Sequence, residues 1–419
     1  MQHTLKHLSN NAKLLIVPTG APSLTALILF GVGSRYETTK LNGISHFLEH
    51  LFFKGSKKRP TAQMIAEEVD AIGGEMNAFT SKEYTGYYIK AAGNHGELVL
   101  DVLSDMLKNP LFDPAEIDRE RGVITEEIKM YEDQPMIYVG ELFEEQMYGD
   151  TSLGRQVIGT RENIALVSRE NFLHHLKTFY TADNMVIVLA GDVSKIKDKA
   201  EHYFADFNGA KGQAASPFSL SASKPRFRMY TKKTEQTHVW VGFPAVSHNH
   251  PDRFAVKVLS AILGGGMSSR LFLSVRERRG LAYYVRCNVE SFLDTGYIAA
   301  SAGVTTEKFE EAMTTILDEL KLVRDESVTD KELQKAKEYL KGKLLLHVEQ
   351  SDGIAEVLGM QALLQKEVLT PAEINARIDG VTAADVARVA QALFVPEKLY
   401  AAVISSHNQS SWLDTHLVI

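Results

Sequence analysis

The sequence has little of several features that define common classes of protein. Its 419 residues include a single cysteine, Cys287, so the chain cannot form an internal disulfide. Its longest apolar runs, such as LTALILFGVG, are shorter than the roughly 20 residues that cross a bilayer. Acidic residues outnumber basic ones by 53 to 46, and no basic stripe of the kind that binds nucleic acid stands out. These absences argue against a disulfide-stapled, membrane-spanning or nucleic-acid-binding protein.

The N-terminal segment MQHTLKHLSNNAKLLIVPTG lacks the apolar core of a signal peptide. Together with the single cysteine, this favours a cytoplasmic protein. The hydrophobic fraction of 44% is sufficient for packed cores, and the length predicts two or three domains. We therefore expect a multidomain globular protein that has neither a nucleic-acid nor a membrane partner.

Two similar halves flank a segment rich in Gly, Ala, Ser and Pro, FNGAKGQAASPFSLSASK. Thr-Gly-Tyr begins at residue 85 in EYTGYYIKAA and again 210 residues later, at 295, in LDTGYIAASA. Two helical patterns follow in each half, which then closes on a strand, NMVIVLAGD or KLYAAVISS. The shared order predicts a duplicated domain of roughly 200 residues. We expect domains at 1–207 and 225–419, joined by a linker at 208–224.

Both halves mix alternating, aromatic-rich strands with long helical stretches. Hairpin-like pairs of strands flank the helices, and Asn10-Asn11 has the composition of a turn between two strands. We therefore predict an α+β fold for each half, consisting of a mostly antiparallel sheet with helices packed on one face.

The segment GISHFLEHLFFKG, residues 43–55, places two histidines and a glutamate within an apolar run. On a helix that ends near Gly55, His46, Glu49 and His50 project from one face. Two imidazoles four residues apart can bind one zinc ion. This is the spacing of the H-x-x-E-H motif, in which the glutamate is a general base. Because so short a motif also arises by coincidence, a metal site requires a third ligand.

A candidate for that ligand lies in DRERGVITEEIKMYED, residues 118–133. An apolar stripe of helical period runs along this segment, formed by Val123, Ile124, Ile128 and Tyr131. At about 100° per residue, Glu120 and Glu127 fall within the stripe, whereas Glu126 falls outside it. Glu127 as a metal ligand, and Glu120 as the acceptor for a ligand histidine's other ring N–H, would satisfy both carboxylates. Ion pairs with arginine or lysine are the alternative.

These residues resemble those of the pitrilysin or insulinase family of zinc peptidases, in particular its short, two-domain branch similar to mitochondrial processing peptidase. The resemblance is carried by HFLEHLFFKGS and by Glu127 in ERGVITEEIKMYED, and it continues through GSRYE, GGEMNAFTSKEYTGYY and GGGMSSRLFLSVRERRGLAYYV. It implies that His46, His50 and Glu127 bind one zinc ion per chain, and that Glu49 is the catalytic base.

The resemblance also implies a substrate site. In the family an edge strand holds the peptide by β-augmentation. The matching residues here are Asn77, Ala78, Phe79 and Thr80. Arg276 and Tyr283 match a pair that reaches the substrate near the metal, where a cation and a phenol stabilise a developing oxyanion. Without the resemblance, residues 77–80 are interpreted as an ordinary strand, and Arg276 and Tyr283 as two surface residues.

The second half has no counterpart of the metal set. At the 210-residue offset the two histidines fall within AVKVLSAILG, and Glu127 falls near KGK. We therefore expect the first half to perform the chemistry and the second half to complete the substrate site. The predicted function is that of a zinc metalloendopeptidase which cleaves peptides or unfolded protein segments inside a closed chamber. By resemblance, two chains of a homodimer would build this chamber. The alternative is a non-catalytic core subunit related to the same family.

Overall fold

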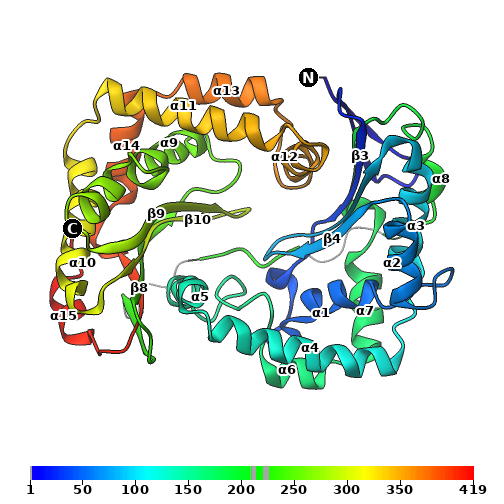
Figure 1. Ribbon diagram of the computed structural model, residues 1–419, viewed down its shortest axis with the longest axis horizontal. Helices are drawn as coiled ribbons and strands as arrows, with labels where there is room; N and C mark the ends of the chain where they lie inside the picture. Colours follow the sequence, from blue (N-terminus) through cyan, green and yellow to red (C-terminus); the bar gives the residue numbers. More distant parts are fainter. Residues whose placement is uncertain (1, 208, 210–213, 220–225) are drawn as a thin grey trace. The chain divides into compact units, whose positions relative to one another are not determined.

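The computed structural model describes residues 2–207, 209, 214–219 and 226–419. The chain forms two compact units, each with its own sheet (Figure 1). The first unit consists of Met1–Lys129, Arg155–Ser216 and Leu345–Ala372, and the second of Met130–Gly154, Pro217–Leu344 and Glu373–Ile419. Much of the predicted linker, at 208, 210–213 and 220–224, lies outside the described residues. The predicted domain boundaries stay a prediction.

The first unit contains a six-stranded sheet in the order β1-β2-β6-β3-β5-β4. Its strands are β1 (Thr4–His7), β2 (Lys13–Pro18), β3 (Ser23–Phe30), β4 (Glu75–Thr80), β5 (Thr85–Ala92) and β6 (Met185–Gly191). β2 and β6 are parallel, and the other neighbours are antiparallel. Asn11, at φ 75°, lies in the turn between β1 and β2, where the Asn-Asn pair predicts one.

The helices of the first unit come from both ends of the sequence. They are α1 (Ile44–Phe52), α2 (Ala62–Asp70), α3 (Gly96–Lys108), α4 (Pro114–Glu132), α6 (Arg161–Leu166), α7 (Arg169–Phe179), α8 (Ala200–Phe204) and α12 (Ser351–Leu364). Within the part of the chain that is described, no helix of either unit is both long enough and apolar enough to cross a membrane.

The second unit contains a five-stranded sheet in the order β7-β11-β8-β10-β9. Its strands are β7 (Phe227–Thr231), β8 (Thr237–Ala245), β9 (Ala282–Ser291), β10 (Gly296–Val304) and β11 (Tyr400–Ser405). Its helices are α5 (Pro135–Tyr148), α9 (Arg253–Gly264), α10 (Phe309–Asp325), α11 (Asp330–His347), α13 (Pro371–Asp379), α14 (Ala383–Leu393) and α15 (Ser410–His416). β7 and β11 are parallel, and the other pairs are antiparallel. The predicted α+β class with mostly antiparallel sheets is confirmed.

Strand β3 is buried from Leu24 to Phe30, which explains its almost continuous apolar sequence. Helix α3 packs against it, and α12, drawn in orange beside β3 in Figure 1, packs against β3 and β6. A β-carbon at Gly359 of α12 would lie 2.9 Å from Leu29 and 2.8 Å from Val188, so this glycine permits the close approach. The structure therefore adds a helix from the second half of the sequence to the sheet of the first unit.

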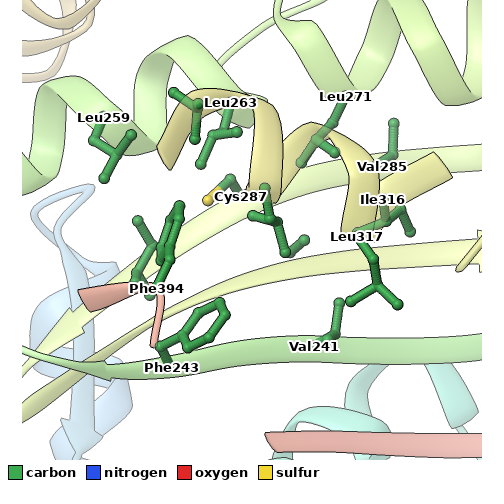
Figure 2. Packing of buried hydrophobic residues seen from close by; sticks show 14 of the residues in the cluster. Val241, Phe243, Leu259, Leu263, Leu271, Val285, Cys287, Ile316, Leu317 and Phe394 are labelled. Carbon is green, nitrogen blue, oxygen red and sulfur yellow. The ribbon is translucent and has the colours of Figure 1, made fainter. Parts of the chain in front are cut away.

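The sheet of the second unit is likewise buried on both faces. On one face Ile298 and Ala300 of β10 join the main core beneath α9, α10 and α14, part of which Figure 2 shows. On the other face Tyr297 and Ala299 pack against Phe143 of α5. The alternation of side chains along β10 thus serves two separate cores. Helices therefore cover both faces of this sheet, rather than the single face that we predicted.

Candidate metal centre and active site

Helix α1 is anchored at its N-terminus by Glu37. The carboxylate accepts hydrogen bonds from the backbone N–H groups of Gly43 and Ser45 and from the side-chain amide of Asn42, at 2.8–3.0 Å. Burial raises the pKa of Glu37, and these hydrogen bonds oppose the rise. Glu37 lies in the GSRYE segment that resembles the family, but no role was predicted for it. The sequence contains a clue to this role, because an acidic residue shortly before a helix can accept hydrogen bonds from the N–H groups at the helix N-terminus.

One face of α1 directs His46 and His50 toward Glu127 of α4. Nε2 of His46 lies 3.7 Å from Oε2 of Glu127, and Nε2 of His50 lies 3.6 Å from the same atom. Two ligand atoms bound to one tetrahedral zinc ion lie roughly 3.4 Å apart. Among the described residues, these three side chains form a group that could hold a metal ion. The structure thus brings the three predicted ligands together.

The electrostatics of this group also fit a cation. Oε2 of Glu127 is buried and has no hydrogen-bond donor within the described chain. Burial raises the pKa of Glu127, and the electrostatic interaction with His50 opposes the rise. Burial, followed by repulsion from His50, lowers the pKa of His46 to about 3. His46 is therefore neutral at physiological pH, the form in which imidazole binds metals.

Glu120 fixes the orientation of His50. Its Oε2 lies 3.1 Å from Nδ1 of His50, and its Oε1 lies 2.8 Å from Nζ of Lys54. Burial raises the pKa of Glu120, but the hydrogen bonds from His50 and Lys54 outweigh burial and lower it. A proton held on Nδ1 leaves the lone pair of Nε2 for a metal. The sequence left two alternatives for Glu120, a ligand histidine or an ion pair with arginine or lysine, and the structure has both. The lysine, Lys54, was not predicted, although it lies four residues after His50 on the same helical face.

The rest of the α4 face differs slightly from the predicted stripe. Ile124 and Ile128 are buried as expected, whereas Val123 is 46% exposed. The side chain of Glu127 is 21% exposed, against 72% for its neighbour Glu126, which pairs with Lys129. The buried stripe is therefore narrower than the sequence indicates, but it separates the two adjacent glutamates.

Glu49, the candidate base, contacts the edge strand β4. Oγ1 of Thr80 donates a hydrogen bond to Oε2 of Glu49 at 2.5 Å. The pKa of Glu49 is raised by burial and, to a smaller extent, by Glu127, while the Thr80 hydrogen bond and His50 oppose the rise. A raised pKa suits a general base, because it brings the proton affinity of the carboxylate closer to the working pH. Thr80, predicted to contact substrate, thus also contacts the candidate base.

We expect Thr80→Val to shift the acidic limb of the pH profile of kcat/KM to higher pH. The hydrogen bond favours the ionised form of Glu49, so its loss raises the pKa of Glu49 further. Because a base acts in its ionised form, more alkaline conditions are then needed for full activity. Thr80→Ser retains a hydroxyl donor and should keep the wild-type profile. An unchanged acidic limb in Thr80→Val would contradict this role.

Strand β4 has β5 on one side and is the edge strand of its sheet. Beside it lies a cavity of about 360 Å³, lined by Asn77, Ala78 and Phe79 of the strand and by His347 and Gln350 from the second half of the sequence. His347 and Gln350 were not predicted, because no local pattern links a strand to a segment about 270 residues away.

Arg276 and Tyr283 lie together in the second unit. The guanidinium of Arg276 is 5.9 Å from the ring centroid of Tyr283 and 4.9 Å from that of Phe272, within range of cation–π attraction. Tyr283 is 73% exposed at the start of β9. The structure brings the pair together, and its approach to a zinc group stays a prediction.

Comparison with known proteins gives a consistent family. The family model described as Insulinase (Peptidase family M16) matches residues 15–161, and the one described as Peptidase M16 inactive domain matches residues 166–340. The chain belongs to peptidase family M16. Its first model match contains His46, His50 and Glu127, and the second extends from the end of the first half into the second half, where no counterpart of the metal set is found.

Curated relatives of this M16 protein carry protease names. It is 39% identical over 390 residues to the Uncharacterized zinc protease YmxG of Bacillus subtilis, an alignment that covers 92% of this chain and 93% of the relative. It is 38% identical over 368 residues to an uncharacterized zinc protease of Streptomyces coelicolor, covering 86% and 80%. These relatives support membership of a peptidase family.

Two solved structures share the fold. A protease from Helicobacter pylori has a TM-score of 0.88 at 23% identity, covering 96% of this chain and 99% of that one. A Pseudomonas fluorescens protein described as a peptidase M16 inactive domain has a TM-score of 0.90 at 18% identity, covering 97% and 98%. At these identities the likeness concerns the fold alone.

Proposed function

We propose that this M16 protein is a zinc-dependent endopeptidase that cleaves peptides or unfolded protein segments. The observation that carries the proposal is the convergence of His46, His50 and Glu127 around a buried carboxylate oxygen that has no hydrogen-bond donor. These three residues would hold zinc. When bound, zinc supplies a Lewis acid that makes a water molecule more acidic and polarises a peptide carbonyl.

The remaining steps belong to the residues of the chain. Glu49 accepts a proton from the attacking water and later delivers it to the leaving amine. Thr80 holds the carboxylate of Glu49 through its hydroxyl. The free edge of β4 binds the peptide through its backbone, which gives affinity with little dependence on sequence. Arg276 and Tyr283 stabilise the negative charge that develops on the carbonyl oxygen.

The proposal is tested by cleavage of a quenched fluorescent peptide, with and without a chelator. We expect activity to disappear on chelation and to return when zinc is added. If the purified protein does not cleave peptides even in the presence of added zinc, the non-catalytic subunit becomes the better account.

We further propose that the working enzyme is a homodimer in which Arg276 and Tyr283 serve the partner's zinc group. Mixing Glu49→Gln chains with Tyr283→Phe chains would then create some dimers with one intact site. We expect activity to rise above that of either inactive parent after subunit exchange. No recovery, despite exchange demonstrated by mass spectrometry, would place Arg276 and Tyr283 in the same chain as the metal ligands that they serve.

A further inference from the structure

The second unit contains a cavity of about 640 Å³ at the counterpart of the group formed by His46, His50 and Glu127 in the first unit. The cavity lies beside the edge strand β9, at the end of α9 and along α11. The β9–β10 hairpin repeats the β4–β5 hairpin, and α9 and α11 take the places in chain order of α1 and α4. The second unit has therefore kept the framework that surrounds the metal group in the first.

The residues on α9 no longer suit a metal. At the offset of the two Thr-Gly-Tyr segments, the places of His46, Glu49 and His50 are taken by Val256, Leu259 and Ser260. Leu259 lies in the apolar core (Figure 2). The hydroxyl of Ser260 donates a hydrogen bond to the backbone oxygen of Cys287 on β9. This helix therefore contributes packing where its counterpart contributes ligands.

The residue on α11 has reversed its charge. Glu127 is the fourteenth residue of α4, and Lys343 is the fourteenth residue of α11. Lys343 lines the cavity, where its Nζ lies 5.9 Å from the ring centroid of Tyr339. A cation thus stands where the first unit has its carboxylate ligand, which favours an anion in the cavity rather than a metal ion.

Other positive charges surround the same space. The cavity is lined by Lys257, Arg276, Arg286 and Lys343, and no aspartate or glutamate is among its described lining residues. All four residues are exposed, and none forms an ion pair with a residue that the structure describes, although Glu290 of β9 attracts Lys257 electrostatically. Several unpaired cations around one concavity attract anions, because the low-dielectric walls concentrate their field.

The neighbouring strand suits a peptide. β10 pairs with one side of β9, no described strand pairs with the other side, and residues 284–289 of β9 line the cavity. An extended peptide can add to such an edge through its backbone. Arginine can then bind a carboxylate through two parallel hydrogen bonds. Edge and charge together favour an extended peptide with acidic side chains over a free anion.

We propose that this cavity binds the carboxylates of an acidic peptide segment, as a substrate-binding site formed by residues of the second unit alone. The identification of the ligand as a peptide rests on the proposed peptidase function. Binding at this cavity requires neither zinc nor Glu49, so it can be measured separately from cleavage.

The test is fluorescence anisotropy with the full-length Glu49→Gln protein and labelled peptides whose ends are blocked. We expect a peptide of alternating Glu and Ala to bind at least about tenfold more tightly than its Gln-Ala counterpart, a difference of roughly 1.4 kcal/mol. The double replacement Arg286→Glu/Lys343→Glu should abolish this preference. Lys331→Glu, on α11 but outside the lining, makes one such charge reversal and should preserve it.

Other outcomes would overturn the proposal. Equal binding of the Glu and Gln peptides would contradict a carboxylate site. An equal loss of the preference in the cavity variants and in Lys331→Glu would contradict it as well. If inorganic phosphate competes as well as the unlabelled acidic peptide does, the ligand of the cavity is a simple anion and not a peptide. The neutral pair Arg286→Met/Lys343→Met, checked by thermal unfolding, should lose the preference too, which guards against misfolding. A protein that cleaves nothing but prefers acidic peptides would contradict the proposed function alone.

Discussion

Glu49→Gln should abolish peptide cleavage while leaving zinc bound. Glutamine has nearly the shape of glutamate, so the helix and its contact with Thr80 can remain, but it cannot accept a proton from water. General-base catalysis typically contributes about 10²–10⁴-fold, so we expect kcat/KM to fall by at least that factor. Kinetics with a quenched fluorescent peptide and metal analysis of the same sample measure both halves of this prediction.

Glu126→Gln provides a matched control. It makes the same chemical change beside the candidate ligand Glu127, but Glu126 points into solvent and pairs with Lys129. We expect this variant to keep wild-type activity and zinc content. Substantial activity in Glu49→Gln would contradict the assignment of Glu49 as the base. Loss of zinc from this variant would mean that Glu49 helps to hold the metal ion instead.

Removing one member of the buried Arg35–Glu83 ion pair should strongly destabilise the first unit. Nη1 of Arg35 lies 2.5 Å from Oε1 of Glu83, and both side chains are 2% exposed. Leaving either charge buried without the other costs about 3–5 kcal/mol. We therefore expect Glu83→Ala to lower Tm by roughly 6–20 °C in thermal unfolding followed by circular dichroism.

The Arg35–Glu83 ion pair supports the candidate site because it joins two segments that contribute residues to it. The backbone N–H of Arg35 donates to the carbonyl of Lys82, so the ion pair holds the β4–β5 turn against the segment that leads to Glu37. The double variant Arg35→Met/Glu83→Leu should recover much of the lost stability, because it removes both buried charges together. Glu116→Ala, which breaks an exposed pair with Arg119, should leave Tm nearly unchanged. Equal effects of Glu83→Ala and Glu116→Ala would contradict the argument.

The local part of the site could be predicted from sequence because helical geometry determines it. His46, Glu49 and His50 share a face at spacings of three and four residues, and the same period separates Glu127 from Glu126. The helical period fixes the angle of each residue around the helix axis, but it does not determine how much of the helix surface other elements bury. Val123 shows this limit, because it belongs to the apolar period and is nevertheless exposed.

The parts that escaped prediction depend on contacts between distant segments. Gly359 reads as an ordinary glycine in a helix until Val188 and Leu29 are seen packed against it. His347 and Gln350 line the cavity beside β4, although nothing in their own segment points to that strand. The replacement of Glu127 by Lys343 in the second half became visible when the starts of α4 and α11 were known.

The central claim is that His46, His50 and Glu127 hold one zinc ion. Its most direct test is the metal content of the purified wild-type protein and of Glu127→Gln, measured by inductively coupled plasma mass spectrometry, with Glu126→Gln as the control. The account predicts about one zinc ion per chain in the wild type and in Glu126→Gln, and far less in Glu127→Gln. A wild-type protein that takes up no zinc, or a Glu127→Gln protein that keeps its full complement, would contradict it.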